Sequence, residues 1–367
     1  MSASAFGDAD TVFMERALAL AERGMFTATP NPRVGCVIVQ YGSVIAEGWH
    51  EWPGEAHAEV AALRAAETQG RDVRGATLYV TLEPCNHTGR TPPCTEALIA
   101  AGVGRVVAAM PDPNAVAAGG AGLLRAAGIR VDVGLCEREA RDLNCGFVSR
   151  VTRGRPFVRL KIAASLDGRS AADDRRSQWI TGKAARDDGH AWRARACAVL
   201  TGIGTVRADN PQLTVRAVAT PRQPLRIVVD RHAQTPPVAK VLEGGALIVT
   251  ADARNDAWPD EVEHVALPDT QGRVDLQAMM HMLGQRGINE LHVEAGARLN
   301  AALLDAGLVD EVLVYVAPSL IGDPAYGIAQ MDAPRSLEQR TQLAFESIDR
   351  IGSDLRIRAR VVDVASN

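Results

Sequence analysis

Four residues between positions 57 and 94 have the types and the order needed for hydrolytic chemistry at a metal. His57 and Glu59 are two residues apart, and two cysteines follow at Cys85 and Cys94. One imidazole and two thiolates supply three zinc ligands and leave the fourth position open for water. Zinc lowers the pKa of bound water from about 15.7 to about 7. Glu59 can then take the proton of that water and return it to a leaving amine.

This order, H-x-E and then Pro-Cys and a second cysteine, is that of zinc deaminases acting on nucleobase-like rings. Predicted secondary structure must bring the four residues together. Apolar periodicity predicts a helix over 56–66, with His57 and Glu59 in its first turn. A buried strand over 77–82 ends shortly before Cys85.

Other interpretations of these residues remain open. A lone H-x-E is ordinarily a surface helix turn, and a lone buried cysteine is ordinarily a small hydrophobe. A purely structural zinc site closes with four protein ligands, and His87 could be the fourth. That alternative predicts a non-enzymatic scaffold that unfolds when zinc is removed.

The segment between the two cysteines is long. Eight residues separate Cys85 from Cys94, where the common deaminase signature has C-x-x-C. Cys94 then opens a predicted helix over 95–101, and a helix N-terminus favours a thiolate. The loop 86–93 (NHTGRTPP) and the upstream segment 30–37 (PNPRVGCV) resemble the deaminase half of the RibD family of bifunctional riboflavin-biosynthesis enzymes.

The resemblance implies a set of residues around the pyrimidine and its phosphoribosyl arm. They are polar side chains of loops and strand ends, namely Asn31, His50, His87, Arg90 and Asp112. Ligands of open α/β sheets collect at such positions. Simpler explanations exist: Asn31 can build a turn beside a proline, His50 can cap a strand, and Arg90 can be solvated. A guanidinium nevertheless suits a phosphate.

The composition favours a two-domain cytoplasmic enzyme. The chain has 367 residues and 47% hydrophobic content, which exceeds one ordinary domain core. A net charge of −4 without a basic run or aromatic ladder argues against nucleic-acid binding. We expect neither a membrane span nor a signal peptide. The four remaining cysteines are expected to be ordinary core thiols: Cys36, Cys136, Cys145 and Cys197.

Strands and helices alternate in the first 150 residues, which predicts a three-layer α/β/α domain. A helix over 10–23 and a hairpin over 33–50 precede the zinc elements. The resemblance makes this fold cytidine-deaminase-like. Residues 149–155 are polar and lack periodicity, so we expect an irregular linker there. The expected domains are a zinc-dependent pyrimidine deaminase over 1–150 and a reductase over 151–367.

The second domain has the pattern of a mixed sheet with flanking helices. Gly202 and Gly204 lack the third glycine of G-x-G-x-x-G, so a standard Rossmann domain is not supported. The segments 161–168 (KIAASLDG) and 177–181 (SQWIT) are similar to the reductase half of the RibD family, whose fold resembles dihydrofolate reductase. The resemblance implies NADPH as the cofactor. Residues 173–176 (DDRR) depart from the Gly-Glu pair usual in the family.

The resemblance also implies the residues of the reductase site. Those expected to meet the substrate are Ser177, Arg193, Leu213, Arg216 and Glu294. Those expected to meet NADPH are Ala163, Trp179, Thr205, Asp209 and the loop starting at Gly296. Arginine pairs well with phosphate, and helix N-terminal amides can hold a cofactor phosphate. A core tryptophan, a turn at 209–211 and a solvated arginine are the structural alternatives. Lys161 and Asp167 are further polar groups near this chemistry.

The function implied by the resemblance is a pair of consecutive reactions. Zinc-dependent hydrolysis deaminates 2,5-diamino-6-(5-phosphoribosylamino)pyrimidin-4-one to 5-amino-6-(5-phosphoribosylamino)uracil. NADPH then reduces the ribosyl group to a ribityl chain. The expected partners are a phosphorylated pyrimidine and further copies of the chain in a dimer or tetramer, because the second domain offers strand edges. The alternative is a deaminase of another nucleobase or nucleoside, such as cytidine or guanine, with a non-catalytic second domain.

Overall fold

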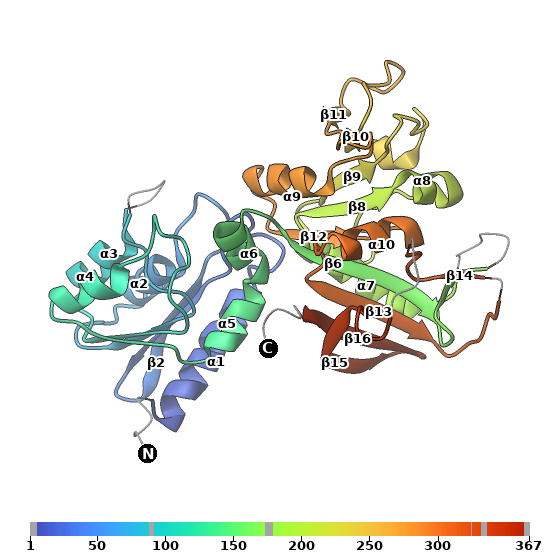
Figure 1. Ribbon diagram of the computed structural model, residues 1–367. Helices are drawn as coiled ribbons and strands as arrows, with labels where there is room; N and C mark the ends of the chain where they lie inside the picture. The colour runs from blue at the N-terminus through green and yellow to red at the C-terminus, as the bar shows by residue number, and fades with distance from the viewer. Residues whose placement is uncertain (1–5, 88–91, 173–178, 324, 332–335, 363–367) are drawn as a thin grey trace. The chain divides into compact units, whose positions relative to one another are not determined.

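The computed structural model describes residues 6–87, 92–172, 179–323, 325–331 and 336–362. The chain forms two compact units, Met1–Arg153 and Gly154–Asn367 (Figure 1). Within the described residues, no helix has both the length and the apolar character needed to cross a bilayer.

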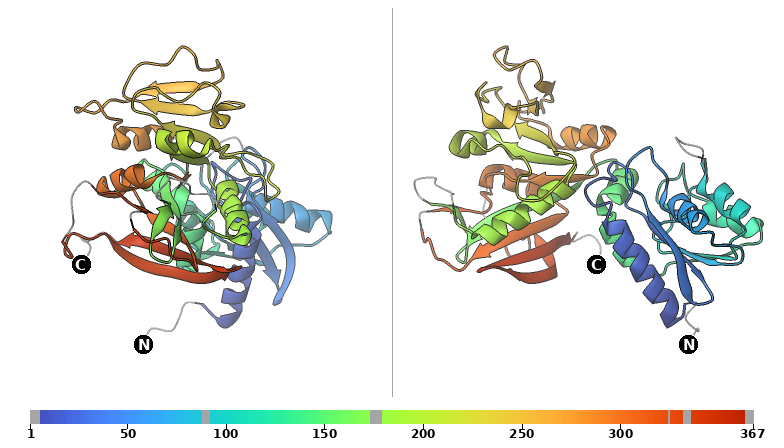
Figure 2. Two further views of the ribbon diagram at one scale, coloured as in Figure 1. Left: turned by 90° about the vertical axis from the view of Figure 1, so that its right-hand side faces the viewer. Right: turned by 180° about the vertical axis from the view of Figure 1, so that it is seen from behind.

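A mixed sheet forms the centre of unit 1. Its strands are β1 (Gly35–Gln40), β2 (Ser43–Trp49), β3 (Thr77–Val80), β4 (Arg105–Ala108) and β5 (Arg130–Val133). They lie in the order β2-β1-β3-β4-β5, antiparallel up to β3 and parallel beyond it. Helices α1 (Asp8–Glu22) and α5 (Glu137–Leu143) cover one face, and α2 (Ala58–Thr68), α3 (Cys94–Ala101) and α4 (Gly120–Ala126) cover the other (Figure 1; Figure 2, right). The expected three-layer α/β/α architecture is confirmed.

Two glycines allow helices to pack directly on the hairpin. A Cβ at Gly35 would lie 2.0 Å from the carbonyl oxygen of Ala17 in α1. A Cβ at Gly48 would lie 2.4 Å from the backbone nitrogen of Ala62 in α2. Any larger residue would push these helices off the sheet, so the close approach requires glycine. Gly48 therefore fixes the height of α2, the helix that carries Glu59.

Unit 2 contains a nine-stranded sheet with flanking helices. Its strands are β6 (Phe157–Ser165), β8 (Ala198–Gly202), β9 (Leu225–Val229), β10 (Leu247–Thr250), β11 (Glu263–Ala266), β12 (Glu290–Val293), β13 (Glu311–Ala317), β15 (Gln342–Ile351) and β16 (Asp354–Val362). The order is β11-β10-β9-β8-β12-β6-β13-β16-β15, parallel except where β16 pairs with β13 and β15. Its helices are α7 (Lys183–Arg195), α8 (Ile203–Asp209), α9 (Leu276–Gln285) and α10 (Ala297–Asp305). A short pair, β7 (Arg169–Ala171) with β14 (Tyr326–Gly327), and a 3-10 turn, η1 (Lys240–Leu242), lie outside this sheet.

Alternating residues of the central strands pack in two separate hydrophobic cores. Leu200 and Ile227 pack in the cluster that includes Met280 of α9. Their neighbours Val199 and Val228 pack in the cluster that includes Val206 of α8. Because successive strand residues point to opposite faces, helices cover both faces of this mixed sheet, as expected.

The predicted irregular linker over 149–155 is wrong for most of its length. Residues Cys145–Arg153 form helix α6, which ends at Gly154 with φ +68°. One side of α6 is buried through Phe147 and Ser149, while Arg153 donates to Ser149 Oγ at 2.7 Å. Polar composition concealed this helix because a single short buried face is enough to stabilise it against the rest of unit 1.

Candidate functional site

The three proposed metal ligands converge from three elements of unit 1. His57 is the N-cap of α2, Cys85 follows β3, and Cys94 is the first residue of α3. Their nitrogen and sulfur atoms all lie within 4.8 Å of one another. His57 Nδ1 is 3.3 Å from Cys94 Sγ and 3.5 Å from Cys85 Sγ.

This geometry fits a tetrahedral zinc ion. Zn–N and Zn–S bonds of ordinary length place the two ligand atoms roughly 3.5 Å apart. The observed separations match that value. His87, which could have closed the site as a fourth ligand, is not a member of this group of described residues. The donor set therefore fits zinc with one open position, which suits catalysis better than a structural role.

The surroundings of the ligands favour the thiolate form of Cys85. A hydrogen bond from the Cys94 thiol, opposed by burial and supported by His57 and the Cys94 backbone N–H, lowers the pKa of Cys85 to about 4. The Cys94 N–H lies 3.3 Å from Cys85 Sγ. Contact with Cys85 in turn raises the pKa of His57, against the effect of burial. A cation at this point would take over the role of these donors.

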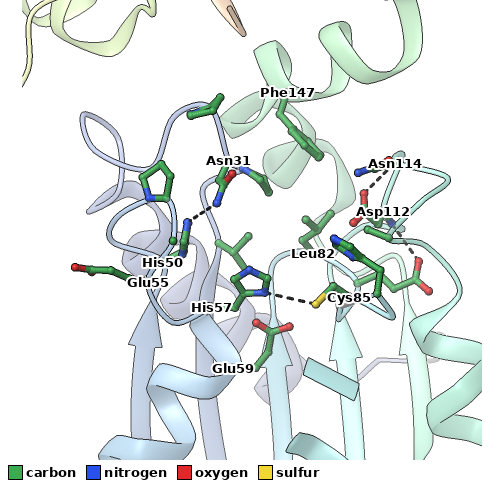
Figure 3. Close-up of a pocket in the computed structure, with 18 of the residues that line it drawn as sticks. Asn31, His50, Glu55, His57, Glu59, Leu82, Cys85, Asp112, Asn114 and Phe147 are labelled. Atoms are coloured by element: carbon green, nitrogen blue, oxygen red, sulfur yellow. Dashed lines mark hydrogen bonds between the residues drawn. The ribbon is translucent and has the colours of Figure 1, made fainter. Parts of the chain in front are cut away.

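Glu59 lies in the first turn of α2, below His57 and close to Cys85 (Figure 3). Its side chain is buried, and burial raises the pKa of Glu59 to about 7 against the opposing effects of its own backbone and His57. A carboxyl group with a pKa near neutrality can both accept and donate a proton at pH 7.

A cavity of about 470 Å³ opens above these residues. On one wall Asn31 Nδ2 lies 3.0 Å from His50 Nε2, and His50 Nδ1 lies 3.1 Å from the Ala56 carbonyl. Burial lowers the pKa of His50, so the ring is neutral, donates through Nδ1 and accepts from Asn31. These two hydrogen bonds orient the Asn31 amide so that its Oδ1 can accept a hydrogen bond from a ligand. The structure thus brings Asn31 and His50 to the cavity wall together with His57 (Figure 3).

Asp112 lines the opposite wall, in a segment held by a residue that sequence reasoning missed. Glu83 is buried and accepts the backbone N–H groups of Asp112 at 3.1 Å and Ala121 at 2.9 Å. Burial raises the pKa of Asp112 to about 6, and the nearby Glu83 charge contributes. The available signal in the sequence was the position of Glu83, directly before the Pro-Cys pair. The role of Glu83 depends on hydrogen bonds to residues 29 and 38 positions later in the chain.

Replacing Glu83 with glutamine should displace the segment that carries Asp112. Glutamine has one acceptor oxygen, so its amide would face a second backbone donor in a buried setting, at a cost of about 1–3 kcal/mol. We expect KM for the substrate of the deaminase to rise and the reductase rate to stay constant. Steady-state kinetics of both reactions on one preparation measure this. Glu96→Gln, an exposed change on α3, is the matched control, and equal KM values for the two variants would contradict the prediction.

Two other predicted residues of this site have different outcomes. His87 lines the cavity, and its Nδ1 is buried without a hydrogen-bond partner among the described residues. Such an orphaned buried donor or acceptor is costly unless a ligand satisfies it. Arg90 lies outside the described residues. The cavity is also lined by residues that the sequence did not single out: Glu55, Asn114, Phe147 and Arg150.

In unit 2 two of the predicted residues, Arg193 and Glu294, form an ion pair beyond the end of strand β12. Glu294 follows β12, and its carboxylate pairs with both Arg193 Nε and Arg193 Nη2, the latter at 2.8 Å. Arg193 Nη1 also donates to the Thr214 carbonyl at 3.0 Å. Burial opposes ionisation, but Arg193 and its neighbours hold the pKa of Glu294 well below its usual range. Arg193 is therefore an orienting partner of Glu294 here, and a phosphate contact would require exchange of these bonds.

Arg216 and Leu213 lie on the loop that Arg193 braces. Arg216 Nη1 donates to Thr214 Oγ1 at 2.8 Å from an exposed position, and its backbone N–H donates to His190 Nδ1 at 3.2 Å. Leu213 is buried in a hydrophobic cluster with φ +56°. A ligand would meet Leu213 through its backbone. Ser177, the remaining substrate residue, lies outside the described residues.

Three of the predicted NADPH residues lie at or beyond the C-terminal ends of central strands. Ala163 is on β6, Thr205 is in α8 beyond the end of β8, and Gly296 is the N-cap of α10 beyond the end of β12. A Cβ at Gly296 would lie only 3.7 Å from Thr205 Oγ1. A hydroxyl beside helix N-terminal amides suits a phosphate, so these residues fit a dinucleotide.

The other predicted groups of this region have mainly structural contacts. Trp179 is 68% exposed and stacks on the Arg186 guanidinium at 4.5 Å, so it is not a core residue. Asp209 ends α8. Asp167 accepts the backbone N–H of Gly322 at 2.7 Å and anchors the loop after β13. Burial lowers the pKa of Lys161. The nearby Glu294 charge raises this pKa, and the Arg193 charge lowers it.

Both units match known protein families. Residues 8–110 match the cytidine and deoxycytidylate deaminase zinc-binding region, and residues 156–357 match the RibD C-terminal domain. The riboflavin biosynthesis protein RibD of Escherichia coli is 46% identical, over 94% of this chain and 98% of that protein. The same protein of Aquifex aeolicus is 41% identical, over 95% and 97%.

Solved structures agree over nearly the full length. Acinetobacter baumannii RibD is 42% identical with a TM-score of 0.89, covering 97% of this chain and 99% of that one. A diaminohydroxyphosphoribosylaminopyrimidine deaminase/5-amino-6-(5-phosphoribosylamino)uracil reductase of Thermotoga maritima is 36% identical with a TM-score of 0.89, covering 96% and 99%.

Proposed function

The chain belongs to the RibD family of riboflavin biosynthesis proteins, and on this basis we propose how its two units carry out deamination and reduction. The first reaction converts 2,5-diamino-6-(5-phosphoribosylamino)pyrimidin-4-one and water to 5-amino-6-(5-phosphoribosylamino)uracil and ammonia. The second reduces the ribosyl group of that product to a ribityl chain. We assign the deaminase to residues 1–150 and the reductase to 151–367, and the compact units divide three residues later, between Arg153 and Gly154.

The buried Glu59 carboxyl beside the His57, Cys85 and Cys94 cluster is the observation that carries the deaminase assignment. These three residues would hold zinc, which would supply a Lewis acid and lower the pKa of a bound water. Glu59 accepts a proton from the attacking water and delivers it to the departing amine, so that ammonia leaves and a carbonyl remains.

The walls of the cavity orient the pyrimidine over Glu59. The Asn31 amide, held by His50, accepts from ring N–H or amino groups. Asp112, in the segment braced by Glu83, faces the ring from the opposite wall. The buried His87 Nδ1 can form a hydrogen bond with the substrate. We assign Arg90 to the same substrate site.

The strand-end site of unit 2 performs the reduction. NADPH supplies the hydride that the reaction consumes. Ala163, Trp179, Thr205, Asp209 and the loop from Gly296 hold this cofactor. The substrate meets Ser177, Arg193, Leu213, Arg216 and Glu294. Arg193 orients the Glu294 carboxylate, and Arg216 is positioned for a phosphate.

We also propose a cytoplasmic homo-oligomer, a dimer or tetramer. β15 is one of the two edge strands of the nine-stranded sheet, and Phe345 on it is 69% exposed. Unpaired edges with apolar side chains favour association. Light scattering of the purified chain tests this, and a monomer at working concentration would contradict it.

Mass spectrometry of the products tests the proposed function. The diaminopyrimidinone substrate is incubated with the zinc-loaded chain, first without and then with NADPH. We expect exchange of one amino group for oxygen without cofactor, then a gain of two hydrogens with it. No deamination of this substrate, combined with deamination of cytidine or guanine, would support the alternative deaminase. Deamination without reduction would remove the reductase assignment alone.

A further inference from the structure

Helix α6 forms part of the deaminase cavity wall although it lies more than 85 residues after His57 in the sequence. A reciprocal clamp fixes its start. The Arg33 backbone N–H donates to Asn144 Oδ1 at 2.8 Å, and Asn144 Nδ2 donates back to the Arg33 carbonyl at 2.9 Å. Arg33 Nη1 also donates to the Leu143 carbonyl at 2.7 Å. These buried bonds hold α6 against the loop that carries Asn31.

Phe147 and Arg150 are the two residues of α6 that line the cavity. Their spacing of three residues places them on the same side of the helix. Phe147 projects from α6 over the cavity, above His57 and Leu82 (Figure 3). The Arg150 guanidinium lies 5.9 Å from the Phe147 ring centre, and its Nη2 donates weakly to the Pro30 carbonyl at 3.4 Å.

The charges around the cavity do not otherwise suit a phosphorylated ligand. Four carboxyl side chains line it: Glu55, Glu59, Glu83 and Asp112. Among the described lining residues, Arg150 is the only arginine or lysine. Carboxylates repel a phosphate, whereas a guanidinium binds one through paired hydrogen bonds. A phosphorylated molecule would therefore place its phosphate at the α6 side.

We propose that Arg150 binds the phosphate of the deaminase substrate, with Phe147 packed against the sugar that carries it. This inference rests on the proposed function, because it assumes a phosphoribosylated pyrimidine in this cavity. The Arg150 guanidinium lies within cation–π range of the Phe147 ring, and both side chains line the cavity, where a phosphate can reach the guanidinium. Arg150 thereby makes the deaminase selective for the phosphorylated substrate.

The decisive experiment compares Arg150→Gln with the unsubstituted chain on substrates with and without the phosphate. Loss of a hydrogen bond to a charged group should raise KM for the phosphorylated substrate about 10- to 100-fold. The value of kcat should change little, because the contact is equally strong in the ground and transition states. With the dephosphorylated substrate the two proteins should have equal KM. Inorganic phosphate should inhibit the unsubstituted deaminase competitively and Arg150→Gln more weakly.

A control variant lies on the same helix. Arg153 does not line the cavity and donates to Ser149 Oγ, so Arg153→Gln should keep the original KM. Zinc content and kcat on the dephosphorylated substrate report correct folding of unit 1 in each preparation. An unchanged KM in Arg150→Gln, or a phosphate preference lost only in Arg90→Gln, would overturn the inference while the proposed function stands. Absence of deamination by the unsubstituted chain would overturn the proposed function and this inference with it.

Discussion

Replacement of Glu59 by glutamine should lower the deamination rate by about 10²- to 10⁴-fold, the usual contribution of a positioned proton carrier. Glutamine has nearly the same shape, so the buried position in α2 stays filled. Its amide cannot take a proton from water and return it to the amine. The three proposed metal ligands are untouched, so zinc content should be unchanged. The reductase lies in the other unit and should retain its rate.

Measuring ammonia release, zinc content and NADPH oxidation on one preparation separates these effects. Glu67→Gln is the matched control, since Glu67 lies in the same helix but is exposed. It should deaminate at the original rate. Near-normal deamination by zinc-loaded Glu59→Gln would show that another group moves the proton. Loss of zinc together with activity would show that Glu59 supports the metal instead.

Replacement of Arg159 by methionine should destabilise unit 2 by about 3–5 kcal/mol, as when one partner of a buried ion pair is removed. Arg159 is 1% exposed and lies between two buried carboxylates. Its Nη1 donates to Glu290 at 2.9 Å, and its Nε donates to Glu311. The Trp192 ring covers its guanidinium at 4.4 Å. Methionine fills much of the volume but leaves both carboxylates without this partner.

The destabilisation should depend on pH in a defined direction. Burial alone would raise the pKa of Glu311, but Arg159 and Arg358 outweigh it and lower the value from 4.5 to about 2. The pair therefore contributes stability above about pH 4.5, and this contribution is lost as pH falls toward 2. The difference between the two proteins should be largest near pH 7 and should shrink below pH 4.5.

Denaturant unfolding at pH 7 and pH 4, followed through loss of reductase activity, measures this effect. Arg358→Gln is the control, because Arg358 also pairs with Glu311 at 2.9 Å but is 25% exposed. We expect a loss of at most about 1 kcal/mol from it. Equal losses in the two variants, or a difference independent of pH, would contradict the assigned role of Arg159.

The sequence alone determined the features that depend on local spacing. Apolar periodicity predicted the helix over 56–66 and the buried strand over 77–82, which the structure shows as Ala58–Thr68 and Thr77–Val80. The order of His57, Cys85 and Cys94 marked them as one ligand group, and their ligand atoms do lie together. Residue type and spacing suffice there because each element is specified by its own side chains.

Tertiary structure decided what depends on contacts between distant segments. The Asn144 clamp joins residues 111 positions apart and helps to place Phe147 and Arg150 on the deaminase cavity. Glu83 acquires its role only when the backbone of a later loop turns two N–H groups toward it. Local patterns do not reveal such partners, because the Asn144 and Glu83 side chains bond to backbone groups that almost every residue carries.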